Sequence, residues 1–438
     1  MPAQIDAVVR HHLTARLEHA RTRTDDLFAL VKPNFLYERP IAERHRIVFY
    51  IGHLEAFDWN LFHESVLGLK RFNPEFDRLF AFGIDPVGGG LPTDELSDWP
   101  SISAVRDYVR KIRESLDENL ETLISERGAD SVVREGFSLA TLLNVAIEHR
   151  LMHAETLAYM LHQLPVDRKV PQLEPPDVVC PPVVPSAVEI PSGTISLGLK
   201  RGGEVFGWDN EYESHTVDVP AFAIDRYKVT NRQYLEFIAA GGYEAHELWS
   251  EDDWNWKTER GVSHPAFWMH HGDQWLYRTM FAEVPLPLDW PVYVSHAEAA
   301  AYAKWAGKSL PTEAEWQRAS SATPRGNDEE PETAFGNFDF ARWNPVPVNA
   351  FPVGRSAFGV EGMLGNGWEW TSTKFAPFPG FEPFPFYRGY SANFFDDKHF
   401  VLKGGSTRTA ECMLRPTFRN WFQPHYQFAY TGFRCVSR

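Results

Sequence analysis

The chain has 438 residues, more than one ordinary core holds, so its length predicts two domains. The formal net charge of −16 excludes the basic face with which proteins bind nucleic-acid phosphates. There is no run of about 18 apolar residues, no signal-peptide core at the N-terminus, and the three cysteines lie far apart in the sequence. We therefore expect a cytoplasmic protein without disulfides that binds neither nucleic acid nor a membrane.

Residues 1–165 have the pattern of long amphipathic helices. Apolar residues recur at helical spacing in four segments, about 5–30, 41–67, 101–124 and 138–163. Ser101 or Ser103 is the predicted N-cap of the third segment. Four such helices predict a four-helix bundle. The connection between the second and third helices is long and rich in glycine and proline, and connections of that length are usually functional or disordered.

The second half of the chain has a different pattern. Prolines over residues 166–188 predict a linker. Over 189–438, short strand-like runs alternate with Gly, Asn and Pro turns. Two short helical segments are predicted there, one capped by Thr230 or Asn231 and one capped by Ser295. The sequence therefore predicts an α+β protein with two domains.

Two histidines four residues apart, His149 and His153, lie on one face of the fourth predicted helix. Such a pair alone is a weak indication of a metal site, and Arg150 excludes the HExxH pattern of zinc proteases. The best third ligand is His53, in an apolar stripe of the second helix, because bundles build metal sites from facing helices. A histidine in such a stripe is often only a core residue. Three neutral imidazoles suit zinc, iron or copper and leave coordination positions open for catalysis.

The acids beside the histidine pair, and the other histidines of this half, are not predicted to bind the metal. Glu148 and Glu155 flank the histidine pair and are either supporting or surface groups, with the surface favoured for Glu148. Five other histidines of this half are interpreted as surface residues: His11, His12, His45, His63 and His162.

Four motifs follow one another in the second half: VSHAEAAAYAKWAGKSLPTEAEWQRAS (294–320), GMLGNGWEWTST (362–373), VLKGGS (401–406) and TGFRCVSR (431–438). This series resembles the formylglycine-generating/sulfatase-modifying fold, a C-type-lectin-like architecture, over about 188–438. Its tryptophans and glycines also serve as scaffold.

A DinB-like helical bundle with three histidines, fused to such a domain, resembles the ergothioneine-pathway sulfoxide synthases. The resemblance implies an Fe(II) enzyme, not a haem protein, that uses O₂ to join a sulfur donor to the imidazole C2 of hercynine, which is trimethylated histidine. It also implies that His53, His149 and His153 are the iron ligands.

The resemblance further implies residues for the small-molecule substrates. The segment FRNWFQP carries Asn420 and Trp421, which line the hercynine pocket in the family, and Phe422 adds an aromatic face for the quaternary ammonium. A tyrosine after the WEWT motif assists the oxygen chemistry, and Tyr390 is preferred to Tyr387 because of its YS context.

Two departures from the family pattern concern the chalcogen donor. Met152 stands where some members have a glutamine that hydrogen-bonds the substrate imidazole. Residues 79–105 contain no Lys or Arg, whereas members that use cysteine or γ-glutamylcysteine have arginines there that clamp carboxylates. Acids such as Asp85 and Asp94, with three consecutive glycines, suit a neutral polyol. We therefore expect the branch of the selenoneine synthases, similar proteins that join hercynine to a selenosugar.

Several alternatives stay open. The donor is cysteine or γ-glutamylcysteine if the carboxylate contacts come from Arg408, Arg415 or Arg419, and a thiosugar is a further alternative. A formylglycine-generating enzyme would use Cys412 and Cys435, and a DinB-type thiol transferase would use zinc. A protein of a different class is a non-catalytic sugar-binding module. The sequence does not indicate an oligomeric state.

Overall fold

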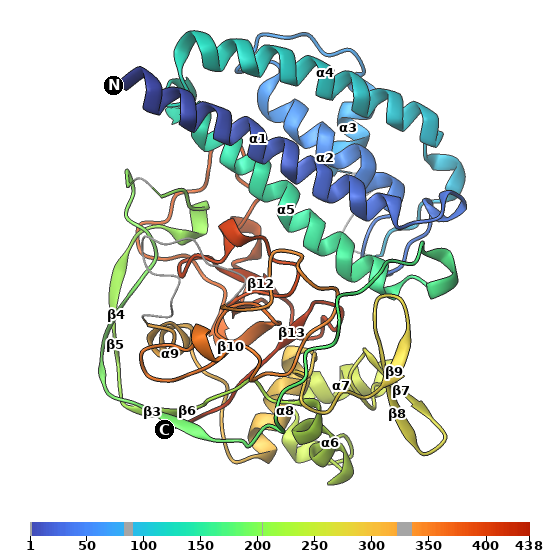
Figure 1. Cartoon of the computed structure of the whole chain (residues 1–438), viewed down its shortest axis with the longest axis vertical. Helices are drawn as coiled ribbons and strands as arrows, with labels where there is room; N and C mark the ends of the chain where they lie inside the picture. Colours follow the sequence, from blue (N-terminus) through green and yellow to red (C-terminus); the bar gives the residue numbers. More distant parts are fainter. Residues whose placement is uncertain (1, 83–90, 204, 322–334) are drawn as a thin grey trace. The chain divides into compact units, whose positions relative to one another are not determined.

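The computed structural model describes residues 2–82, 91–203, 205–321 and 335–438. The chain forms two compact units, unit 1 (Met1–Pro171) and unit 2 (Gln172–Arg438) (Figure 1). Unit 1 is helical and unit 2 combines strands with short helices, so the predicted two-domain α+β class is confirmed. None of the helices in these ranges is long and apolar enough to cross a membrane.

Unit 1 is built from the four predicted helices and one further helix. Its elements are α1 (Pro2–Ala29), α2 (Ile47–Phe62), α3 (Pro74–Phe82), α4 (Ile102–Arg127), α5 (Leu139–Gln163) and the small hairpin β1 (Val132–Arg134) and β2 (Phe137–Ser138). Helix α2 packs against α3, α4 and α5, and α1 packs against α5. The Ser101 hydroxyl accepts from the Ala104 N–H and caps α4, which decides between the two predicted caps.

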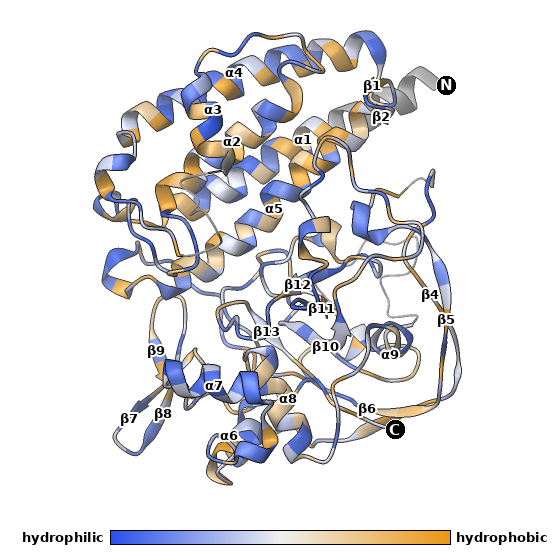
Figure 2. Ribbon diagram, turned by 180° about the vertical axis from the view of Figure 1, so that it is seen from behind, coloured by the Kyte–Doolittle hydropathy of each residue, from blue (hydrophilic) through white to orange (hydrophobic). Residues whose placement is uncertain are grey.

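Helix α4 shows why this half folds as a bundle. Its buried residues recur every three or four positions: Val105, Tyr108, Ile112, Leu116, Leu120, Leu123 and Ile124. The hydrophilic and hydrophobic patches that alternate along α4 in Figure 2 are the two faces of this pattern. Burial of the apolar face provides most of the stability of such a helix.

The composition of the segment between α2 and α4 predicted a long connection without a helix, and the structure differs. The segment contains helix α3, which begins with a complete helix-start signature. The Asn73 side chain accepts from the Phe76 N–H, Pro74 takes the first helical position, and Glu75 and Asp77 lie in the first turn. The glycines and prolines further along outweighed this signature in the sequence analysis.

A buried ion cluster holds α2 against α5. Arg150 on α5 is fully buried; its guanidinium binds Glu55 at 3.0 Å and Asp58 at 2.7 Å and donates to the Leu54 carbonyl at 3.1 Å. From α4, Arg113 binds the same Glu55 at 2.7 Å. Burial opposes the charge of Glu55, but the arginines outweigh it and lower the pKa of Glu55 to about 2. Glu55 therefore stays ionised, whereas burial raises the pKa of Asp58. The cluster fixes the register of the helices, because a shifted register would leave its buried groups unpaired.

Outside residues 204 and 322–334, unit 2 contains four small sheets and four α-helices. The central sheet has the order β12-β11-β10-β13, in which only the β10–β13 pair is parallel. The strands are β3 (Ala187–Ile190), β4 (Gly193–Leu197), β5 (His215–Val219), β6 (Phe222–Asp225), β7 (Trp268–His271), β8 (Gln274–Arg278), β9 (Glu283–Pro285), β10 (Trp368–Lys374), β11 (Phe400–Lys403), β12 (Asn420–Phe422), β13 (Thr431–Gly432) and β14 (Val436–Ser437). Strand β3 begins inside the segment 166–188 that the sequence analysis assigned to a linker.

Two of the helices of unit 2 were missed by the sequence analysis. The helices are α6 (Asn231–Ala239), α7 (Glu251–Arg260), α8 (His296–Trp305) and α9 (Glu313–Ala319). Thr230 and Ser295 cap α6 and α8, in agreement with the prediction. Helix α7 has Ser250 as its N-cap, and α9 begins with a capping box of Thr312 and Glu315. Both signatures are readable in the sequence.

The described residues also form eight short 3-10 helices. They are η1 (Pro33–Phe35), η2 (Leu96–Asp98), η3 (Val166–Arg168), η4 (Asp209–Glu211), η5 (His246–Leu248), η6 (Pro352–Gly354), η7 (Ala392–Phe394) and η8 (Glu411–Met413).

A second buried ion pair anchors the centre of unit 2. Arg434, near the C-terminus, binds Glu369 of the WEWT motif at 2.6 and 2.9 Å, and Lys228 contacts the same carboxylate at 3.2 Å. Trp368 and Trp370 on either side of Glu369 are buried, as is Trp316 of α9. These motif residues therefore act as scaffold, as expected.

Replacing Arg150 tests the ion cluster of unit 1. Arg150→Met removes the arginine that binds Asp58 and one of the two that bind Glu55. We therefore expect the free energy of unfolding of unit 1 to fall by about 3–5 kcal/mol. Denaturant unfolding followed by far-ultraviolet circular dichroism measures the loss. The control is Arg110→Met, which removes an exposed pair with Glu114 and should change little. Equal losses in the two variants would contradict a structural function of the buried cluster.

Candidate functional site

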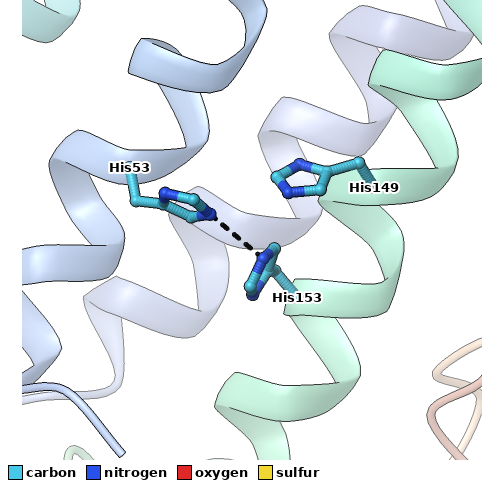
Figure 3. Close-up of side chains that lie close together, drawn as sticks. All are labelled: His53, His149 and His153. Atoms are coloured by element: carbon cyan, nitrogen blue, oxygen red, sulfur yellow. Dashed lines mark hydrogen bonds between the residues drawn. The ribbon is translucent and has the colours of Figure 1, made fainter. Parts of the chain in front are cut away.

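Three predicted histidines converge inside unit 1. His53 projects from α2, and His149 and His153 project from adjacent turns of α5 (Figure 3). One ring nitrogen of each lies within 4.8 Å of the others, and the Nε2 atoms of His53 and His153 are 3.2 Å apart. Two ligands about 2.1 Å from one ion are separated by roughly 3 Å. The histidines thus fit a common metal ion.

Helix α3 fixes the orientation of His53. The Nδ1 atom of His53 lies 2.7 Å from the Phe80 carbonyl oxygen. A carbonyl only accepts, so Nδ1 carries the proton and Nε2 presents its lone pair to the site. A hydrogen bond of this kind orients metal-binding histidines and sets their tautomer.

The surroundings keep the three imidazoles neutral. Burial lowers the pKa of His53 to about 4 and holds the pKa values of His149 and His153 well below the usual range. The Phe57 ring stacks on His149 at 3.5 Å and Phe49 stacks on His53 at 4.8 Å, which makes the site apolar. Neutral imidazole is the form that binds zinc, iron or copper.

Three remote segments of unit 2 meet in a cluster of aromatic rings. Trp421 on β12 stacks on Phe375 at 4.2 Å and lies edge-on to Tyr390 at 5.4 Å. Tyr390 stacks on Trp208 at 4.0 Å and lies 5.5 Å from Tyr387. Trp421, a predicted substrate residue, and Tyr390, the preferred catalytic tyrosine, are therefore neighbours. We call these five rings the aromatic cluster.

Asn420 and Phe422 lie on the other face of β12 from Trp421, because side chains alternate along a strand. Phe422 stacks on Tyr426 at 4.8 Å, and the Asn420 carbonyl oxygen of the side chain accepts from the Trp421 N–H at 2.9 Å. The three predicted residues of this segment are thus divided between two environments.

Comparison with known proteins was made for the whole chain. Residues 16–157 match the DinB superfamily, and residues 176–438 match the family described as the Sulfatase-modifying factor enzyme 1-like domain. The chain is 34% identical to hercynine oxygenase of Mycolicibacterium smegmatis over 444 residues, which cover 95% of this chain and 99% of that protein. This chain belongs to the ergothioneine-pathway sulfoxide synthase family.

Two further relatives are similar over different shares of their length. Hercynine oxygenase of Mycobacterium tuberculosis is 42% identical over 250 residues, which cover 55% of this chain and 58% of that protein. Ergothioneine biosynthesis protein 1 of Neurospora crassa is 27% identical over 495 residues, which cover 92% of this chain and 55% of that protein. The predicted family is therefore confirmed.

In this member of the sulfoxide synthase family, several side chains near the histidines are more buried than predicted. Glu148 and Glu155 on α5 are 2% and 8% exposed, so the surface interpretation, favoured for Glu148 and one of two alternatives for Glu155, is wrong. It is also wrong for His63 and His162, each 2% exposed, because helix packing covers them. The side chains of His11 and His12 lie outside the described residues. Met152 is half-buried on α5.

Of the two acids that we expected to contact the donor, the structure describes only Asp94. Asp85 lies outside the described residues. Asp94 is buried, and its carboxylate binds Arg39, accepts from the Arg46 Nε at 2.7 Å and accepts from the Trp99 indole N–H at 2.7 Å. Asp94 therefore has an intramolecular function in this structure, and we do not carry it into the donor site. Its arginine partners lie about fifty positions away in the sequence, where spacing gives no indication of them.

The Trp208–Glu211 turn is part of the aromatic region and was missed by the sequence analysis. Glu211 accepts from the Arg415 Nε at 2.8 Å and from the Thr417 hydroxyl at 2.7 Å, and the Arg419 Nη1 donates to the Asn210 carbonyl. These bonds join the turn to the segment that carries Asn420 and Trp421. The sequence WDNE holds an aromatic ring and two acids but gives no spacing by which to recognise a site.

Gly52 provides a test of the support for His53. A Cβ at this position would overlap the Phe80 ring, so Gly52→Ala should displace α3 and the carbonyl that orients His53. We expect metal affinity to fall by about 10- to 100-fold, as for other partners that orient a ligand. Competition with a chromophoric chelator measures the affinity. Gly203→Ala in unit 2, where the nearest atom is the Lys200 carbonyl oxygen at 3.3 Å, is the control. Unchanged affinity in Gly52→Ala would remove Phe80 from the site.

Proposed function

We propose that this chain is a non-haem iron enzyme that uses O₂ to join a chalcogen donor to the imidazole C2 of hercynine. The observation that carries the proposal is the convergence of three neutral histidines in a chain that aligns over nearly its whole length with a protein named hercynine oxygenase. Three protein ligands leave coordination positions for other molecules, which is typical of catalytic sites.

In the proposed enzyme, the residues of unit 1 hold Fe(II), which supplies Lewis acidity and redox chemistry when it is bound. His53, His149 and His153 are the proposed ligands. The Phe80 carbonyl keeps the His53 proton on Nδ1, so Nε2 stays available. Phe57 and Phe49 cover the imidazole faces and exclude water from them.

We propose that the aromatic cluster and its neighbours bind hercynine. A quaternary ammonium group has no N–H to donate, so it favours aromatic faces and anionic groups. Trp421 and Tyr390 offer such faces, and Asn420 and Phe422 flank Trp421 in the chain. The arrangement of Trp421 edge-on to Tyr390 supports a common function for these two residues.

We further propose that the donor is a selenosugar. Residues 79–105 carry no basic side chain, and the nearby arginines have intramolecular partners: Arg39 and Arg46 bind Asp94. In unit 2, Arg415 binds Glu211 and Arg419 binds Glu313 at 2.9 Å. Arginines with such partners are poor clamps for an amino-acid carboxylate, which favours a neutral polyol. Half-buried Met152 adds an apolar, polarisable contact near the histidines.

Product analysis tests the donor. Iron-loaded protein is incubated with hercynine and O₂ and, in separate reactions, with a selenosugar, a thiosugar, cysteine or γ-glutamylcysteine. We expect mass spectrometry to detect the selenosugar conjugate of hercynine as the fastest product. The His149→Ala variant is the control for product that does not depend on the metal site. Faster sulfoxide formation from cysteine or γ-glutamylcysteine would contradict the selenosugar proposal and support the ergothioneine-type alternative.

Other functions make different predictions about the metal and the cysteines. A formylglycine-generating enzyme needs reactive thiols, but burial raises the pKa of Cys435 well above its usual range. A zinc thiol transferase would retain zinc when iron is supplied under reducing conditions, and a non-catalytic sugar-binding module would need no metal. Metal analysis of iron-replete protein separates these functions, and we expect one iron per chain.

Tyr390 is the proposed catalytic tyrosine. Tyr390→Phe should keep iron and the ring stack on Trp208, because neither needs the hydroxyl, but should slow the O₂-dependent step about 100-fold or divert its product. Oxygen consumption, product mass and iron content are measured together. Tyr387→Phe tests the alternative tyrosine. An unchanged rate and product in Tyr390→Phe would remove Tyr390 from the chemistry.

A further inference from the structure

A buried carboxylate beside the aromatic cluster is only half satisfied. Asp209, in the turn after Trp208, is 0% exposed. Its Oδ1 atom accepts from the Ser391 hydroxyl at 2.6 Å. Its Oδ2 atom is buried without a hydrogen-bond partner in the described part of the chain. An unpaired carboxylate oxygen in the interior is costly, so its retention needs a reason.

The turn holds this carboxylate in a fixed place. The Trp208 ring on one side of Asp209 stacks on Tyr390. On the other side, Glu211 is bound by Arg415 and Thr417. Ser391, whose hydroxyl binds Oδ1, directly follows Tyr390 in the chain. Asp209 is therefore linked to the aromatic cluster twice, through its chain neighbour Trp208 and through Ser391. A rigid carboxylate cannot turn away to find another partner.

The carboxyl of Asp209 is mostly ionised at neutral pH. Burial raises the pKa of Asp209 to about 6, while the Ser391 hydroxyl and the backbone N–H groups of Phe384 and Asn210 stabilise the anion. Arg201, whose charge also lowers this pKa, is paired with Glu213 at 3.1 Å. The negative charge of Asp209 is therefore left for a ligand.

We propose that Asp209 is the counter-ion of the substrate's quaternary ammonium group, with Trp208, Tyr387 and Tyr390 supplying aromatic faces around that group. This assignment rests on the proposed function, in which hercynine is the substrate. A carboxylate with aromatic rings is the combination that attracts a cation without N–H groups. A metal ion fits less well, because His53, His149 and His153 form the one metal-binding cluster found among the described residues.

If this assignment is right, Asp209 selects the substrate and does not merely stabilise the fold. The trimethylammonium is the group that distinguishes hercynine from other imidazole carboxylates. Asp209 should therefore stabilise binding of hercynine and contribute nothing to an analogue that lacks the cation. A purely structural aspartate would affect both ligands alike.

Calorimetric titration of the iron-loaded protein without O₂ tests the assignment. The two probes are hercynine and imidazolepropionate, which has the same ring and carboxylate but no ammonium. Asp209→Asn keeps the size of the side chain and removes its charge. We expect hercynine affinity to fall about tenfold or more and imidazolepropionate affinity to stay within about twofold.

Asp218→Asn is the matched control, because it removes one charge from an exposed position on β5 of the same unit. It should leave both affinities unchanged. If Asp209→Asn does not fold, Ser391→Ala, which removes the donor to Oδ1, should give a smaller loss that is also selective for hercynine.

The outcomes separate this inference from the proposed function. If the unsubstituted protein does not bind hercynine, the proposed function fails. If it binds hercynine and Asp209→Asn weakens both probes equally, or neither, the proposed function stands and the assignment of Asp209 is overturned.

Discussion

The candidate metal site depends on one buried interaction, the ion cluster of Arg150 with Glu55 and Asp58. Arg150 directly follows His149 on α5, and Glu55 lies two positions after His53 on α2. The same contact that fixes the two helices therefore fixes the separation of their histidines. Buried ion pairs often add little net stability, but they favour one register over others because a shifted register leaves charges unpaired.

The histidine cluster, unlike the ion cluster of Arg150, carries no charge. Its three imidazoles are kept neutral by burial and are surrounded by phenylalanine rings. The Nε2 atoms of His53 and His153 lie 3.2 Å apart, within hydrogen-bond distance, and His53 presents a lone pair there because its proton is on Nδ1. A metal ion that binds to these imidazoles binds only the folded site, so metal binding and the stability of unit 1 are coupled. In unit 2, Asp209 is a buried group that is only half satisfied.

Local patterns in the sequence predicted much of this molecule. Helical spacing predicted α1, α2, α4 and α5. The three histidines that converge were predicted from the i, i+4 relation of His149 and His153 and from the apolar stripe around His53. Helices α3 and α9 also had local signatures, Asn73-Pro74 and Thr312 with Glu315, from which the sequence analysis predicted no helix.

Long-range contacts could not be predicted in this way. Asp94 is bound by arginines from a different segment, and Glu148 is 2% exposed, which its neighbours in the sequence do not indicate. The pairing of Asp209 with Ser391 joins residues 182 positions apart. Such contacts depend on tertiary packing, so a charge pattern alone, such as the acidic segment 79–105, is a weak guide to a donor.

Anomalous scattering at the iron absorption edge, from crystals of the iron-loaded protein, tests the central claim most directly. We expect one iron per chain, bound by ring nitrogens of His53, His149 and His153, with Nε2 of His53 toward the ion and Nδ1 still bonded to the Phe80 carbonyl. Iron bound elsewhere, or any of the three imidazoles turned away from the ion, would contradict the proposed metal site and the oxygen chemistry assigned to it.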